Sequence, residues 1–235
     1  MMIDAALNPA EIARLPQRDL SGTTCVVFDI LRATSTMITA LAHGAQEIHP
    51  VRTIEEAQEL RREHPRALLG GERHGERIDG FDLGNSPLEY REVGAARIIT
   101  TTTNGTVALR ACEHAERVLV GALLNLNALV EELRWSEPER VLLVCAGTFE
   151  DFALEDAVAA GLLAAEFPDA KRTDSAHAVV ATARLFPTAL EALRASRNGQ
   201  VLAGKGRDAE VQWCAQTSRY TVVGVMDGAV IRPLH

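Results

Sequence analysis

The sequence lacks several features by which large classes of protein are recognised. Its 235 residues carry a formal net charge of -8 with no run rich in lysine or arginine, so no nucleic-acid or anionic-membrane surface is expected. No apolar run approaches the ~18 residues of a membrane-spanning helix, and the first residues do not resemble a secretory signal. The sequence therefore predicts a cytoplasmic protein, a possible homo-oligomer, whose partners are small molecules.

Cysteine is scarce and forms no recognisable motif. The four cysteines are widely separated, with no C-x-x-C pair and no zinc-like histidine spacing. We therefore expect reduced, mostly buried thiols. The seven histidines form no ligand pair at helical spacing either, and His74, in a glycine-rich stretch, is the best candidate among them.

Three familiar phosphate-handling motifs are also missing. A P-loop is excluded because Lys205, which lies between two glycines, is not followed by a hydroxyl residue. The loop of cysteine phosphatases needs five residues between Cys and Arg, whereas Cys112–Arg117 and Cys214–Arg219 each enclose four. Aspartyl-phosphate phosphatases carry a second acid two residues after the first, and Leu31 takes that position after Asp29.

What is present is the pattern of an α/β protein, with 47% hydrophobic and 24% charged residues. Short apolar runs alternate with amphipathic segments, which predicts a layered sheet with crossover helices. Strands are expected at about residues 24–30, 47–51, 67–69, 97–101, 117–121 and 140–145. Helices are expected at about residues 35–43, 54–63, 105–115, 125–135 and 154–167.

The pattern changes near residue 168. Residues 1–167 are predicted to form an α/β core that carries the active-site crevice, and residues 168–235 a mostly helical extension or small second lobe. The extension ends in a predicted hairpin of residues 220–225 and 229–232, because Asp227-Gly228 is a strong turn signal. It could close one edge of the sheet, act as a lid or contact another subunit.

Polar side chains gather where the predicted strands end. They are Asp29 and Arg32 after the first strand, Glu72 and Arg73 after the third, Thr103, Asn104, Gly105 and Thr106 after the fourth, and Gly147 and Thr148 after the sixth. Ligands of open α/β sheets bind at the carboxyl ends of the strands. The sequence therefore predicts one crevice that collects these groups.

The stretch from Asp29 to Thr36 places an acid, an arginine and several hydroxyl residues at the start of a predicted helix. Because a helix N-terminus attracts anions, Arg32 could clamp a phosphate or sulfonate there. Asp29 could hold a metal ion or act as a base. The alternative is a structural Asp29–Arg32 pair beneath a capped helix.

Residues 70–87 form a glycine-rich stretch without helical or strand periodicity, and we predict a ligand-binding loop. Glu72 and Asp82 offer hard oxygens to a divalent cation, and Arg73 offers a planar fork to an oxyanion. Asn85 and Ser86 form a polar turn and are further candidates for substrate binding. The alternative is an ordered surface loop held by an Asx turn.

Two more turns could present donors to an oxyanion. Thr103, Asn104, Gly105 and Thr106 open one helix, whereas Thr100 and Thr101 belong to the strand before it. Gly147 and Thr148 precede the acids Glu155 and Asp156 at the start of another helix. Only one of these adjacent acids is expected to enter the crevice, and Asp156 is the preferred ligand or base. The alternative is that both acids only favour the helix dipole.

Five blocks of this sequence resemble, in order, those of the 2-phosphosulfolactate phosphatases, the ComB family. They are Asp29 to Thr36, Gly70 to Arg73, Gly80 to Pro87, Thr102 to Thr106 and Gly147 to Asp156, within a match from about Thr24 to Gly161. Weaker similarity continues at Ser196, Gly199 and Asp208.

This resemblance implies a magnesium-dependent phosphatase that converts 2-phospho-3-sulfolactate to 3-sulfolactate and phosphate, a step of coenzyme M biosynthesis. Such a substrate carries three anionic groups, which accounts for arginines beside carboxylates. Our hypothesis is in-line attack by a metal-oriented water. Asp29, Glu72 and Asp82 would be ligands of Mg²⁺, and Glu155 or Asp156 would position or deprotonate the nucleophile.

Three alternatives stay open at this point. An aspartyl-phosphate on Asp29 could replace direct attack by water. The substrate could be another small phosphorylated hydroxy acid. The chain could also be a phospho-ligand-binding module without catalytic activity, although several carboxylates beside a bound phosphate favour an enzyme that uses a cation.

Overall fold

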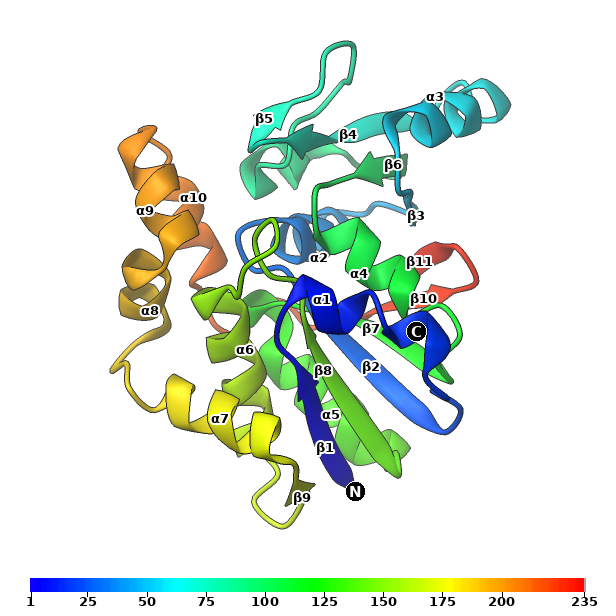
Figure 1. Ribbon diagram of the computed structural model, residues 1–235. Coiled ribbons are helices and arrows are strands. Elements are labelled where there is room, and N and C mark those ends of the chain that lie inside the picture. Colours follow the sequence, from blue (N-terminus) through cyan, green and yellow to red (C-terminus); the bar gives the residue numbers. More distant parts are fainter. Residues whose placement is uncertain (235) are drawn as a thin grey trace.

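A computed structural model describes residues 1–234 as a mixed α/β structure built on one twisted sheet (Figure 1). The α/β fold class predicted from the sequence is confirmed. Within the described part of the chain the sheet has eleven strands, in the order β5-β4-β6-β3-β11-β10-β7-β2-β8-β1-β9. In sequence order the strands are β1 (Met2–Ala6), β2 (Thr23–Phe28), β3 (Glu47–Pro50), β4 (Leu68–Arg73), β5 (Glu76–Arg77), β6 (Arg97–Thr101), β7 (Arg117–Gly121), β8 (Arg140–Cys145), β9 (Lys171–Arg172), β10 (Gly224–Asp227) and β11 (Val230–Pro233).

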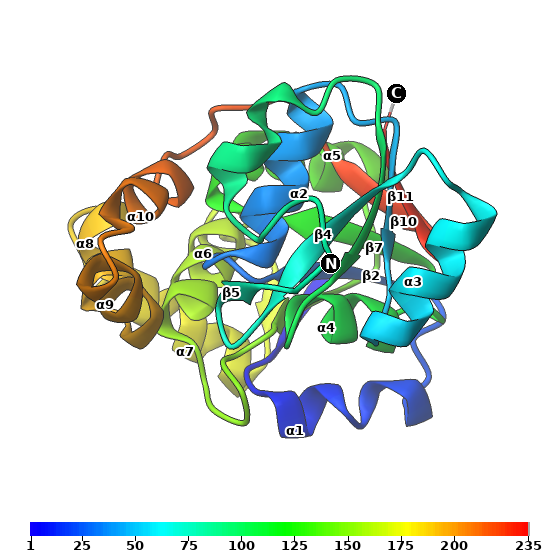
Figure 2. The same cartoon turned by 90° about the horizontal axis from the view of Figure 1, so that it is seen from above.

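Helices pack around this sheet (Figures 1 and 2). They are α1 (Pro9–Ile12), α2 (Ala33–Ala42), α3 (Ile54–Glu63), α4 (Gly105–Ala111), α5 (Leu126–Ser136), α6 (Leu154–Ala165), α7 (Asp174–Ala183), α8 (Ala189–Ala195), α9 (Arg197–Gly204) and α10 (Asp208–Cys214), with 3₁₀ turns η1 (Leu15–Gln17), η2 (Pro87–Glu92) and η3 (Leu123–Asn125). No helix of residues 1–234 is both long and apolar enough to cross a membrane.

The central strands are buried on both faces, as their continuous apolar sequence requires. Along β2, Val26 and Phe28 pack into one hydrophobic cluster with α5, α6 and α7. Cys25 and Val27 point the other way and pack with α2 and α4. All four cysteines are buried and unpaired among the described residues, which confirms that prediction.

Several predicted elements are confirmed to the residue, including β6, β7, β8 and α3. The strand β1 was missed, because Asp4 and two alanines have weak strand propensity. It pairs in parallel with β8 on one side and with β9 on the other, and it is therefore an internal strand.

The prediction that Gly70 to Arg73 lies in a loop is wrong, because these residues complete strand β4. Its glycines serve packing. A Cβ on Gly70 would lie 2.0 Å from the hydroxyl of Tyr90, and one on Gly71 would lie 2.0 Å from the carbonyl oxygen of Thr101 on β6. Only glycine permits neighbours to come this close to the strand.

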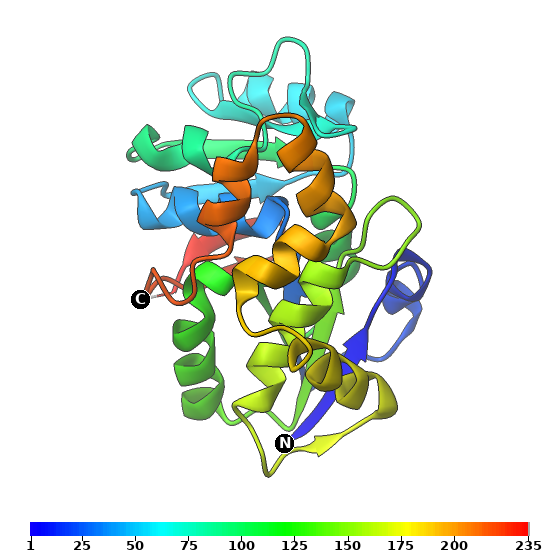
Figure 3. The same ribbon diagram turned by 90° about the vertical axis from the view of Figure 1, so that its left-hand side faces the viewer.

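The C-terminal hairpin is confirmed, although its first strand begins at Gly224 rather than at residue 220, and it does not lie at an edge of the sheet. Strands β10 and β11 turn at Asp227 to Val230 and lie between β7 and β3, in the middle of the sheet. The helices α7 to α10 lie beside the sheet (Figure 3). The last residue of the predicted extension, His235, lies outside the described residues.

The hairpin also reverses the direction of the strands within the sheet. Since β10 is antiparallel to β7 and β11, and β11 is antiparallel to β3, the group β3, β6 and β4 runs opposite to the group β7, β2 and β8 in the ladder. Twist accumulates over the strands between the groups, so that they lie across one another (Figure 1). The carboxyl ends of β2, β4, β6 and β8 thereby meet around one pocket.

Candidate active site

The pocket encloses about 820 Å³, its open mouth included. One wall consists of the segments that follow β2, β4, β6 and β8, and the other consists of α9 and the turn after it. Eight residues proposed from the sequence line it: Asp29, Arg32, Glu72, Asn85, Thr103, Asn104, Gly147 and Thr148. The structure thus brings most of the predicted groups into one crevice.

Asp29 follows β2 and lines the pocket at the start of α2. Burial raises the pKa of Asp29 to about 7; a hydrogen bond from the Ala33 amide opposes the shift, and Glu72 and Glu155 raise the pKa further. The charge of Arg32 acts in the opposite direction and lowers the pKa. The second carboxylate oxygen of Asp29, Oδ2, lies against Gly105, where a Cβ would come within 2.6 Å.

Glu72 is the last residue but one of β4 and lines the pocket. One carboxylate oxygen accepts a hydrogen bond from the Thr103 amide at 2.7 Å, and the other accepts one from the Gly75 amide at 2.7 Å. These two bonds fix the carboxylate opposite Asp29. Each oxygen keeps a lone pair, so Glu72 can still bind a cation or a water molecule.

Arg32 is 5% exposed and lines the pocket from the start of α2. Its guanidinium donates to Glu210 at 2.6 Å and to the Gly75 carbonyl oxygen at 2.9 Å. In the described structure, no ion pair with Asp29, the structural alternative considered from the sequence, holds Arg32 in place. Glu210 of α10 is its ion-pair partner, and this buried pair joins the start of α2 to α10.

The two acids at the start of α6 are both buried and have different partners. Asp156 accepts hydrogen bonds from the Ile30 amide at 2.8 Å and from the Gly147 amide at 3.1 Å, which ties the end of β2 to the turn after β8. Glu155 instead accepts a hydrogen bond from Asn198, a residue of the pocket wall, at 2.6 Å. The preference for Asp156 over Glu155 as a ligand or base stays a prediction, since neither acid lines the pocket itself.

Burial raises the pKa of both acids. For Asp156 the charges of Glu155 and Asp29 raise it further. For Glu155 the hydrogen bond from Asn198 acts in the opposite direction. The carboxyl groups of Asp29, Glu155 and Asp156 thus share one buried region of low dielectric. Such a region favours either their protonation or a bound cation.

Thr103 is the clearest donor in the pocket wall. Its hydroxyl oxygen is buried without a hydrogen-bond partner among residues 1–234, although the residue lines the pocket. Asn85 also lines the pocket, and its carbonyl oxygen accepts a hydrogen bond from Thr36 of α2 at 2.9 Å. An unpaired buried hydroxyl is costly unless a ligand pairs with it.

Other predicted substrate binders are engaged within the protein. Asn104 ties its loop to the next by donating to the carbonyl oxygens of Ala146 and Phe149. Thr106 exchanges hydrogen bonds with Thr102. Gly105 allows the close approach of Asp29 rather than offering a donor to the pocket.

At the turn after β8, the predicted binders are also engaged. Gly147 has φ +77 and donates its amide to Asp156. Thr148 accepts a hydrogen bond from Asn198 at 2.5 Å. Both residues line the pocket and shape it, with these groups already paired.

Seven predicted site residues lie outside the pocket lining: Gly105, Thr106, Glu155 and Asp156, described above, and also Asp82, Arg73 and Ser86. Asp82 accepts hydrogen bonds from Arg61 and from the Leu69 amide, both at 2.8 Å, and therefore braces β4 from the outside. Arg73 donates to Thr101 at 2.9 Å because alternation along β4 turns it away from the side of Glu72. Ser86 is buried as the N-cap of η2. The metal role of Asp82 and the binding roles of Arg73 and Ser86 stay predictions, and none of the three residues lines the pocket.

Sequence reasoning missed the basic wall of the pocket. Arg197, Lys205 and Arg207 come from α9 and the turn that follows it, and they line the pocket opposite Asp29. His74 lines it as well and stacks on Phe149, with 6.0 Å between the ring centroids. The signal for this wall was a basic pair flanked by glycines, Gly204-Lys205-Gly206-Arg207, containing one of only two lysines.

The donor set can be compared with what Mg²⁺ requires. Among residues 1–234 no group of three His, Cys, Asp or Glu side chains is placed to hold a metal ion. Mg²⁺ is commonly held by one or two carboxylates, with waters and phosphate oxygens completing its octahedron. Asp29 and Glu72 supply such a pair, and they lie near enough for the charge of Glu72 to raise the pKa of Asp29.

Comparison with known proteins is consistent with this geometry. A family model described as 2-phosphosulpholactate phosphatase matches residues 10–229. Relatives named "Probable 2-phosphosulfolactate phosphatase" include that of Thermotoga petrophila, 38% identical over 228 residues, covering 94% of this chain and 97% of the relative. The protein of Symbiobacterium thermophilum is 39% identical over 226 residues, with 92% and 97% covered. That of Deinococcus radiodurans is 40% identical over 199 residues, with 82% and 83% covered.

Proposed function

The chain belongs to the 2-phosphosulfolactate phosphatase family, and we propose that it hydrolyses 2-phospho-3-sulfolactate to 3-sulfolactate and inorganic phosphate with the aid of Mg²⁺. One observation carries the proposal. A pocket places the carboxylates of Asp29 and Glu72 opposite a wall of basic side chains. Carboxylates suit a cation, and basic groups suit the several anionic groups of such a substrate.

Asp29 and Glu72 would hold the cation, which when bound neutralises phosphoryl charge and lowers the pKa of water. The Thr103 hydroxyl would donate to a phosphoryl oxygen, since it has no partner among the described residues. Glu155 lies behind Thr148 and Asn198, where it can hold a proton. Arg32, fixed by Glu210, would keep positive charge beside the phosphate.

In the proposed reaction water attacks phosphorus in line, the bond from phosphorus to the lactate oxygen breaks, and the departing oxygen takes up a proton. An aspartyl-phosphate on Asp29 is the alternative route. Labelled oxygen from water entering free phosphate, without a trapped adduct, would support direct attack. A phosphoryl adduct recovered on Asp29 would contradict it.

The test is phosphate release from 2-phospho-3-sulfolactate with and without Mg²⁺, for wild type and Asp29→Asn. We expect magnesium-dependent turnover that falls by about a thousandfold in Asp29→Asn, because that carboxylate meets the reacting group. Asp82→Asn is the matched control. It removes an acid outside the pocket lining and is expected to leave kcat within about twofold.

Two other outcomes identify competing functions. Faster turnover of 2-phospholactate or 2-phosphoglycerate would support a phosphatase activity but indicate a different substrate. It would also contradict a role in the coenzyme M pathway. Binding of these anions without any turnover would indicate a phospho-ligand-binding module. The carboxylate pair favours the enzyme, since a passive phosphate site gains nothing from adjacent acids.

A further inference from the structure

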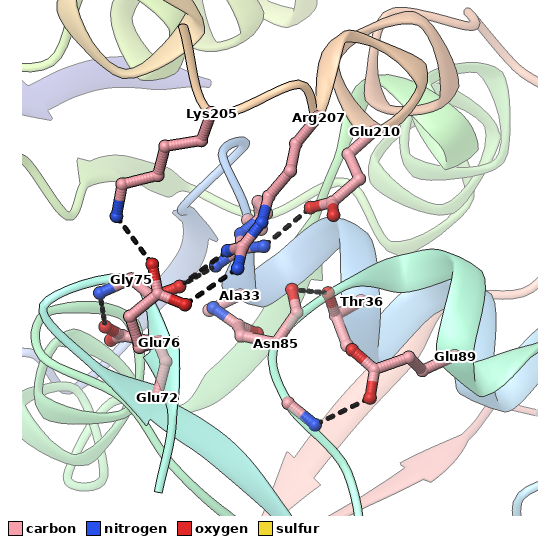
Figure 4. A network of polar contacts seen from close by, with 12 residues as sticks. Ala33, Thr36, Glu72, Gly75, Glu76, Asn85, Glu89, Lys205, Arg207 and Glu210 are labelled. Atoms are coloured by element: carbon pink, nitrogen blue, oxygen red, sulfur yellow. Dashed lines mark hydrogen bonds and ion pairs between the residues drawn. The ribbon is translucent and has the colours of Figure 1, made fainter. Parts of the chain in front are cut away.

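Two of the basic groups that line the pocket are paired with an acid that does not line it. Glu76 of the short strand β5 accepts from Lys205 Nζ at 2.6 Å and from Arg207 Nη2 at 2.7 Å (Figure 4). Arg207 also donates to the Gly75 carbonyl oxygen at 2.9 Å. The β4–β5 hairpin is thereby held against the turn between α9 and α10.

These contacts differ in kind from the one made by Arg32. The side chains of Lys205, Arg207 and Glu76 are 41%, 31% and 55% exposed, whereas those of Arg32 and Glu210 are 5% and 11% exposed. Exposed ion pairs contribute little to stability, because water competes for both partners. The buried pair is therefore fixed, and the pairs of Glu76 can be exchanged for another anion.

The chemistry of a suitable anion follows from the positions of these groups. Lys205 and Arg207 project from one wall, while Asp29 and Glu72 occupy the other. All four side chains line one pocket, so a substrate whose phosphoryl group lies beside the acids can place a second anionic group against the two cations. A carboxylate or sulfonate in that position would meet an ammonium and a guanidinium, which both bind such oxyanions well.

We propose that Lys205 and Arg207 form a second anion subsite that selects phosphate monoesters bearing a further acidic group, and that Glu76 is its exchangeable counter-ion. The proposal rests on the proposed phosphatase function and extends it by naming what sets substrate class. In the substrate-free protein Glu76 neutralises the two cations. When the acidic group of the substrate binds, it replaces the Glu76 carboxylate, which is exposed enough to be released to water.

The experiment compares Arg207→Gln, Lys205→Gln and Glu76→Gln with wild type on two substrates. One is 2-phospholactate, which carries a carboxylate; the other is isopropyl phosphate, which has no second acidic group. The ratio of kcat/KM for the two esters should fall about tenfold in Arg207→Gln and Lys205→Gln, because each loses a charged hydrogen bond to the acid. In Glu76→Gln the KM for 2-phospholactate should fall about threefold, because the competing carboxylate is gone.

Matched controls come from an exposed pair on α3, Arg62 with Glu59, which lies outside the pocket lining. Arg62→Gln and Glu59→Gln make the same changes of charge and should leave the ratio within twofold of wild type. Equal losses on both esters in Arg207→Gln would overturn the proposal. So would an unchanged or raised KM for 2-phospholactate in Glu76→Gln.

Calorimetric binding of 3-sulfolactate separates this proposal from the proposed function. This probe has no phosphate and needs no turnover. An affinity about tenfold lower in Arg207→Gln supports the subsite even if no ester is hydrolysed, in which case the phosphatase function alone fails. Affinity equal to wild type in both basic variants, with esters still hydrolysed, contradicts the subsite and leaves the phosphatase function standing.

Discussion

Threonine hydroxyls near the pocket differ in whether their polar atoms are already paired. Thr106 both donates to and accepts from the Thr102 backbone and side chain, which closes the first turn of α4. Thr103, three residues earlier, leaves its buried hydroxyl without a partner in the described part of the chain. At the scale of single residues, this difference separates a structural side chain from one available to a ligand.

Thr103→Val tests that distinction. Valine keeps the shape and removes only the unpaired hydroxyl, so the free energy of unfolding should stay equal or rise by about 1 kcal/mol. Turnover should fall at least tenfold, because one donor to the phosphoryl group is lost. Phosphate release and urea unfolding measure the two effects.

Thr106→Val is the control for this experiment. It breaks paired hydrogen bonds, and we expect unfolding to become easier by about 1–2 kcal/mol. A Thr103→Val protein that keeps wild-type kcat and KM would show that the hydroxyl does not meet the substrate.

At the scale of secondary-structure elements, a charged cluster joins three neighbouring strands, β6, β3 and β11. Glu47 of β3 accepts hydrogen bonds from Arg97 of β6 and from Arg232 of β11, the latter at 2.7 Å, and also contacts His49 at 3.0 Å. Burial alone would raise the pKa of Glu47, but these hydrogen bonds outweigh it and hold the pKa at about 2. The acid therefore bridges the hairpin and the β3–β6–β4 group.

This cluster predicts a definite dependence of stability on pH. A pKa below the ordinary value of 4.5 means that ionised Glu47 stabilises the fold above pH 4.5 and that this contribution is lost as pH falls toward 2. Glu47→Gln should lower the free energy of unfolding by about 2 kcal/mol at pH 7. The difference from wild type should shrink steadily below pH 4.5 in urea titrations.

Glu59→Gln, on exposed α3, provides the comparison and should change stability by less than about 0.5 kcal/mol at any pH. If Glu47→Gln lowered the free energy of unfolding by as much at pH 3 as at pH 7, the stabilising role assigned to ionised Glu47 would be contradicted.

The C-terminal hairpin decides the architecture of the whole molecule. Strands β10 and β11 connect β7 to β3, so the two groups of strands form one sheet only through the last dozen described residues. Ile231 is fully buried and Met226 nearly so, in the cluster that also contains α2 and α4. The pocket, which uses strand ends from both groups, depends on this connection.

A chain ending at Ser218 should therefore lose cooperative folding. Removing the hairpin leaves β7 and β3 as unpaired edges and exposes apolar side chains on both. We expect a broad thermal transition by circular dichroism, binding of a hydrophobic dye and no phosphatase activity. A chain ending at Leu234 keeps both strands and should melt like wild type; a sharp transition in the shorter chain would refute this view.

The sequence by itself determined the local elements and the residue types at their ends. Alternating apolar runs predicted β6, β7, β8 and α3 to the residue, and Asp227-Gly228 predicted the hairpin, because such signals depend on neighbours in the chain. It also indicated the family and placed Asp29, Glu72 and Thr103 at strand ends, where the pocket now collects them.

Only the tertiary structure decided which of these groups face the pocket. Pairing of Asp82 with Arg61, of Arg32 with Glu210, and the wall formed by Lys205 and Arg207 join residues that are far apart in sequence. Gly70 and Gly71 look like a flexible loop until Tyr90 and β6 come against them. Side-chain direction and charge pairing depend on sheet order and twist, and these are set by packing across the whole chain rather than by local pattern.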